Sequence, residues 1–140
     1  MSVVMAAPAI GIQLPESMLP AATQNTAIVL EAPKTGFISV ENYAEKAAKD
    51  ADIDPIKFKK LISCESVWKE DAAGDNGTSF GILQFKDPTF ELFNKKYKFE
   101  RRDIMNPQHQ IDLAVLMISD GYIYHWKNCG KKIGWIPTAK

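Results

Sequence analysis

Residues 54–84 read DPIKFKKLISCESVWKEDAAGDNGTSFGILQ, which joins one amphipathic helix to the loop that follows it. The stretch begins with Asp-Pro, and Asp is a favoured helix cap while Pro suits the first helical position. The residues that recur at helical spacing on one face are Phe58, Leu61, Ile62 and Glu65. The segment from Gly74 to Gly77 is rich in turn-forming residues and predicts a loop. A carboxylic acid therefore stands at the end of an otherwise apolar helix face.

Three further segments carry helical signals. Apolar residues recur at helical spacing from Val40 to Ala51, and Ser39 can cap that segment. Asp87-Pro88 opens a short helix and Asn106-Pro107 a longer one. No alternating strand of useful length appears. The sequence predicts a mainly α-helical domain, with an irregular basic tail after Trp126.

Composition restricts the class of protein. The chain has 140 residues, 46% of them hydrophobic, which suits one folded domain. Seventeen basic residues balance seventeen acidic ones, so nucleic-acid binding is not expected. No apolar run approaches the ~20 residues of a membrane span. Two cysteines are too few for a four-cysteine zinc site.

Charge and composition are uneven along the chain. Residues 1–36 carry only three charges and are rich in Ala, Pro, Thr and Gln, so we expect a flexible leader or linker there and a folded domain over residues 37–140. The apolar start of the leader lacks the basic region that precedes a secretory signal core. Residues 55–140 carry fourteen basic and ten acidic residues. This excess indicates either solvated surface charge or an anionic partner such as a cell-wall polymer.

Three short motifs carry a resemblance to a known family. They are Glu65-Ser66-Val67-Trp68, Gly81-Ile82-Leu83-Gln84 and the run from Asn106 to Ala114. Their order and spacing resemble those of the lytic transglycosylases of the goose-type-lysozyme superfamily, whose third motif is an Asn-Pro-x-x-Asn-Ile helix. The resemblance covers roughly residues 40–126 and implies a small lysozyme-like helical fold with a substrate cleft.

The resemblance also implies an activity. Such enzymes cleave peptidoglycan between N-acetylmuramic acid and N-acetylglucosamine without a metal or other cofactor. Glu65 matches the single catalytic acid and base, and its apolar neighbours are expected to raise its pKa and keep it protonated. Ser79, Phe80 and Gln84 are expected to line the cleft. We expect a monomer that acts outside the cytoplasm.

One family motif is missing. The family often has Ala-Tyr-Asn, whose Tyr approaches the catalytic Glu, whereas this chain has Tyr122 and Tyr124 in a different context. Either tyrosine can take that place in the cleft, or both can be core aromatics of the last helix.

Other functions stay open from the residues alone. Asp75, or Asp71, can act as a second carboxylate that activates water, which would make the protein a hydrolytic lysozyme (muramidase). Asp75 also belongs to an Asp-Asn-Gly turn. A non-catalytic glycan-binding module is another alternative. A cysteine-dependent cell-wall amidase would instead use Cys64 with His109 or His125.

The two cysteines are Cys64 and Cys129. Because peptidoglycan lies outside the cytoplasmic membrane, where thiols are often oxidised, we expect a disulfide between them. Cys64 immediately precedes Glu65, so helix geometry points it about 100° away from the catalytic face. The bond is therefore expected behind the catalytic helix. The alternative is a buried thiol at Cys64 and a free one at Cys129.

Overall fold

The computed structural model describes residues 38–138, and the leader predicted over residues 1–36 lies outside this part of the chain. In chain order the elements are α2 (Val40–Asp50), α3 (Pro55–Ser66), β2 (Ala73–Gly74), β3 (Ser79–Phe80), β4 (Phe85–Lys86), α4 (Asp87–Lys96), α5 (Pro107–Ser119), the 3₁₀-helix η2 (Tyr122–Trp126) and α6 (Lys127–Lys132). The prediction of a mainly α-helical domain is confirmed.

Capping side chains begin three of the helices where the sequence predicts. Ser39 Oγ accepts a hydrogen bond of 3.0 Å from the backbone N–H three residues later. Asp54 and Asn106 each accept one of 2.9 Å from the N–H two residues later. The helix α4 differs, because Asp87 lies in its first turn and no side chain caps it.

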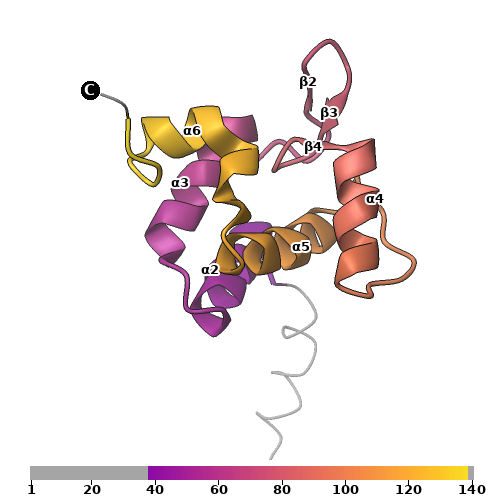
Figure 1. Ribbon diagram of the computed structural model, residues 1–140, viewed down its shortest axis with the longest axis horizontal. Coiled ribbons are helices and arrows are strands. Elements are labelled where there is room, and N and C mark those ends of the chain that lie inside the picture. Colours follow the sequence, from indigo (N-terminus) through magenta and orange to yellow (C-terminus); the bar gives the residue numbers. More distant parts are fainter. Residues whose placement is uncertain (1–37, 139–140) are drawn as a thin grey trace, which may run out of the picture. The chain divides into compact units, whose positions relative to one another are not determined.

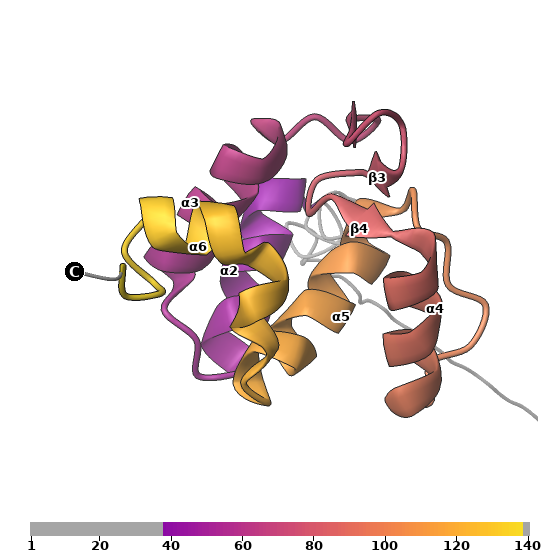
Figure 2. The same cartoon turned by 45° about the horizontal axis from the view of Figure 1, so that its top comes forward.

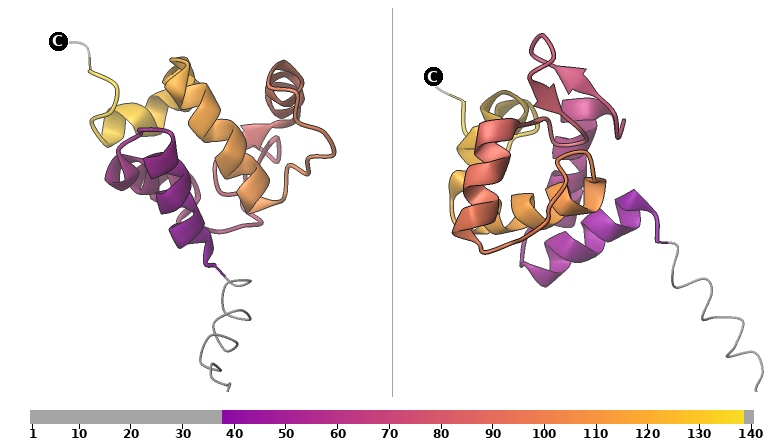
Figure 3. Two further views of the ribbon diagram at one scale, coloured as in Figure 1. Left: turned by 90° about the horizontal axis from the view of Figure 1, so that it is seen from below. Right: turned by 90° about the vertical axis from the view of Figure 1, so that its right-hand side faces the viewer.

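The helix α5 occupies the centre of the domain. It packs against α2 on one side and α4 on the other (Figures 1 and 2). The fully buried apolar side chains of α5 are Ile111, Leu113, Ala114 and Met117. Figure 3 shows the chain continuing from α5 into α6, which packs against α3 although the two are far apart in sequence.

The sheet is small and connects α3 to α4. It has three antiparallel strands in the order β2-β3-β4, each two residues long. Ser79 pairs with Gly74 on one side and with Lys86 on the other. Strands of two residues are too short to produce an alternating pattern, which is why the sequence does not reveal them.

The expectation of an irregular tail after Trp126 is wrong. Residues 127–132 form α6, and Ile136 beyond it is 3% exposed. A disulfide at Cys129 attaches α6 to α3. The tail is therefore ordered by a long-range bond and by burial, which local sequence patterns do not reveal.

Candidate active site

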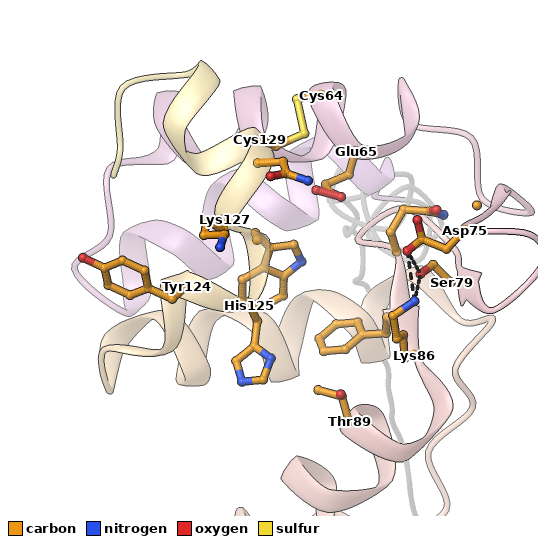
Figure 4. A pocket seen from close by; sticks show the side chains of 15 residues that line it. Cys64, Glu65, Asp75, Ser79, Lys86, Thr89, Tyr124, His125, Lys127 and Cys129 are labelled. Carbon is orange, nitrogen blue, oxygen red and sulfur yellow. Dashed lines mark hydrogen bonds and ion pairs between the residues drawn. A yellow bond between two sulfur atoms is a disulfide. The ribbon is translucent and has the colours of Figure 1, made fainter. Parts of the chain in front are cut away.

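A cavity of about 540 Å³ opens between the end of α3, the sheet, the start of α4 and the segment from η2 to α6. Figure 4 shows Glu65 at its top, with Asp75, Ser79 and Lys86 together on one side and Tyr124 and Lys127 on the other. The further residues in its wall include Gln84, Thr89, His125, Trp126 and Asn128. The cavity thus combines several polar groups with aromatic surface, a combination that is common in ligand-binding sites.

Glu65 lies in the last turn of α3, with its side chain in the cavity wall. The helix ends one residue later because Val67 and Trp68 adopt left-handed backbone angles, with φ of 46° and 65°. This conformation is unusual for a β-branched residue such as Val. The abrupt end of the helix leaves the Glu65 carboxyl group at the boundary between the core and the cavity.

The environment of Glu65 favours its protonated form. Burial raises its pKa from 4.5 to about 7, and the nearby negative charge of Asp75 acts in the same direction. A carboxylic acid that keeps its proton near neutral pH is the group that a glycosidase needs as its general acid.

Ser66 connects the first motif to the second. Its buried hydroxyl donates a hydrogen bond of 2.8 Å to the carbonyl oxygen of Ile82. The end of α3 is therefore bound directly to the Gly-Ile-Leu-Gln turn, and the Glu-Ser pair has a structural reason to occur together.

Gln110, in the third motif, binds the backbone of the second motif and of the residue before it. The side chain is fully buried, its Oε1 accepts from the Leu83 N–H at 2.8 Å, and its Nε2 donates to the Phe80 carbonyl at 2.9 Å. Gly81 has a φ of +78°, and a Cβ there would overlap the Gln110 amide. Trp126 Nε1 adds a hydrogen bond of 2.9 Å to the Leu83 carbonyl. Hydrogen bonds thus connect the three motifs and η2 to one another.

Asp75 is held by two neighbours on the sheet. Its Oδ2 accepts from Ser79 Oγ at 2.7 Å and from Lys86 Nζ at 2.9 Å. The hydrogen bonds from Lys86 and Ser79 lower the pKa of Asp75. Asp75 is therefore a paired anion in the cavity wall, whereas exposed Asp71 lies outside that wall.

The predicted disulfide between Cys64 and Cys129 is present, with a Cα–Cα distance of 5.8 Å. Its expected place behind the catalytic helix is wrong, because both cysteines line the same cavity as Glu65 (Figure 4). The reason is that α6 crosses the end of α3 at the cavity edge. Neither sulfur is a free thiol, which excludes the cysteine-dependent amidase.

The structure separates the remaining candidate residues. Gln84 and Tyr124 line the cavity together with Ser79, and Gln84 Nε2 donates to the Gly81 carbonyl at 2.9 Å. Phe80 and Tyr122 are not in the cavity wall. The Tyr122 ring instead packs against Phe93, with ring centroids 4.9 Å apart, and the Phe80 carbonyl is the group bound by the third motif.

Sequence reasoning missed several residues of the cavity wall, among them Lys86, Thr89 and Lys127. Lys86 reaches Asp75 only because the antiparallel register places it opposite Ser79. No sequence signal marks a pair eleven residues apart across two short strands. The sequence allows Trp126 as part of a cleft wall, and the structure places it there, but only the structure reveals the hydrogen bond from its indole to the Leu83 carbonyl.

Residues 38–138 hold no group of three or more His, Cys, Asp and Glu side chains arranged to bind a metal. In the same residues no helix is long and apolar enough to cross a membrane.

The chain matches the profile of a known family. The sequence profile of the transglycosylase SLT domain matches residues 42–128, which is more than half of the chain and includes all three motifs. No curated protein sequence and no solved structure matches at a significant level.

Proposed function

Because the chain belongs to the transglycosylase SLT domain family, which acts on peptidoglycan, we propose that it is a lytic transglycosylase with Glu65 as its single acid and base. The bond cleaved is the one between N-acetylmuramic acid and N-acetylglucosamine. The observation that carries the assignment of Glu65 is its partly buried carboxyl group in the cavity, with a pKa raised to about 7. The substrate and the disulfide both support a site of action outside the cytoplasm.

The proposed reaction uses one carboxyl group twice, first as an acid and then as a base. Protonated Glu65 donates its proton to the glycosidic oxygen as the bond to the muramic residue breaks. The Glu65 carboxylate then accepts the proton of a muramic hydroxyl as this oxygen closes the anhydro ring. No water is consumed, and Glu65 ends in its starting protonation state. The acetamido group of the substrate can stabilise the intermediate, as in other substrate-assisted glycosidases.

The pairing of Asp75 supports this mechanism over hydrolysis. A hydrolytic muramidase needs a second carboxylate that is free to take a proton from water. Asp75 Oδ2 is instead bound by Ser79 and Lys86, and these bonds lower its pKa, which makes it a weaker base. We assign to Asp75 the electrostatic role of keeping Glu65 protonated.

Mass spectrometry of the products from purified cell walls tests the proposal. The intact protein should release anhydro products, which are lighter by one water than those of a muramidase. Glu65→Gln should fold normally and lose about a hundred- to ten-thousand-fold in rate, since an amide cannot deliver the proton. Glu70→Gln is the matched control, because this exposed side chain lies outside the cavity wall. Hydrolysis products without the anhydro ring would favour the muramidase. Binding without turnover by the intact protein would favour the non-catalytic module.

A further inference from the structure

The helix α6 brings unpaired positive charge to the cavity edge. Its six residues include three lysines and no acidic residue. All three lysines are exposed, and none makes an ion pair within residues 38–138. Lys86, on the opposite side of the cavity, is instead neutralised by Asp75 (Figure 4). Part of the excess of basic residues in the second half of the chain is thus concentrated in α6, near Glu65.

Two of these lysines lie on the same face of α6. Lys127 lies in the cavity wall, and Lys131 follows it by one helical turn. Residues four apart lie on the same helix face, so the two form a short row that leads away from the cavity. We call Lys127 and Lys131 the α6 lysine row.

The row has a fixed position relative to the proposed acid. Cys129, between the two lysines in sequence, is bonded to Cys64, the residue before Glu65. The covalent link prevents α6 from moving away from the end of α3. A ligand that binds the row is therefore held at a defined place relative to Glu65.

We propose that the α6 lysine row binds the carboxylates of the peptide stems that peptidoglycan carries on its muramic residues. This inference rests on the proposed function, since it concerns the substrate of the same cavity. A stem is attached to the sugar beside the scissile bond, so a stem carboxylate and the reacting glycosidic bond lie on one strand. Exposed lysines suit such mobile anions, because an ammonium group is a hydrated point charge that accepts many approach directions. The row would therefore select strands that still carry stems.

Steady-state kinetics on soluble glycan strands with intact stems tests the row. Lys127→Met with Lys131→Met removes both charges and keeps most of each aliphatic chain. We expect KM to rise by about 1.5- to 5-fold per lysine with kcat unchanged, the range of exposed ion pairs. On the same strands with their carboxylates amidated, the variant and the parent should have equal KM. Lys60→Met is the matched control, because this exposed lysine makes no ion pair within residues 38–138 and lies outside the cavity wall.

Two results would contradict the proposal that the α6 lysine row binds stem carboxylates. An equal rise of KM on both substrates would show a structural effect rather than recognition of carboxylates. Preferential binding of a phosphodiester wall polymer over stem-bearing strands would assign the row to a different anion. Binding of stem-bearing and amidated strands to Glu65→Gln, followed by tryptophan fluorescence, examines the row without turnover. This binding measurement can therefore fail or succeed independently of whether the parent cleaves the strands.

Discussion

Replacing Glu65 by Gln is expected to stabilise the domain in alkaline solution and to leave its stability in acid unchanged. The folded-state pKa of Glu65 is about 7, whereas an ordinary glutamic acid has 4.5. Between these two pH values the folded protein keeps a proton that the unfolded chain has released. The free energy of unfolding of the parent therefore falls as pH rises from 4.5 to about 7. Gln does not titrate and escapes this loss.

The size of the effect follows from the two pKa values. At about 1.36 kcal/mol for each pKa unit, the difference corresponds to roughly 3 kcal/mol. Because the Glu65 side chain is only partly buried, solvent screening reduces the expected gain to about 1–2 kcal/mol. For a domain of this size each kcal/mol moves the melting temperature by about 4–8 °C.

Urea unfolding of the parent and of Glu65→Gln at about pH 4 and about pH 8 measures this gain. The midpoints should coincide at the lower pH and separate at the higher one. Glu70→Gln, which alters an exposed carboxylate outside the cavity, should show no such pH-dependent gain. Equal midpoints for the parent and Glu65→Gln at the higher pH would refute the raised pKa, and with it the reason for choosing Glu65 as the acid.

Three further predictions concern groups around Glu65. The kcat/KM of the parent should fall as pH rises through about 7, the pKa of Glu65. Asp75→Asn should move this decline to lower pH, because the substitution removes a negative charge that raises the Glu65 pKa. A pH profile of kcat/KM for both proteins measures the two effects. Replacing Cys64 and Cys129 together by Ser opens a loop with a sequence separation of 65 residues. This change should lower the free energy of unfolding by about 4 kcal/mol, and an unchanged urea midpoint would contradict it. Gln110→Ala leaves the buried N–H that it binds without a partner, which should cost about 1–3 kcal/mol and reduce kcat, as thermal melts and rates will show.

Local sequence patterns determined the helices α2, α3, α4 and α5 and where they begin, but not η2 or α6. Ser39, Asp54 and Asn106 are recognisable as caps because each contacts a backbone N–H only two or three residues away. The helical spacing that placed Glu65 on an apolar face also depends on neighbours within two turns. Those interactions are readable from sequence, since their geometry is the same in any helix.

The family resemblance supplied what local patterns do not, namely the order of three motifs and the candidate acid among them. It did not explain the motifs. Ser66 matters because its hydroxyl reaches the Ile82 carbonyl, and Gln110 because its amide fits where Gly81 has no Cβ. These reasons appear only when the helices are packed.

The contents of the cavity wall were decided by tertiary structure. Lys86 pairs with Asp75 through the register of two-residue strands, and α6 reaches Glu65 through the bond between Cys64 and Cys129. Each contact joins residues whose distance along the chain says nothing about their distance in space. A sequence determines which groups are available, whereas the folded backbone determines which of them meet, because hydrogen bonds and ion pairs act over only a few ångströms.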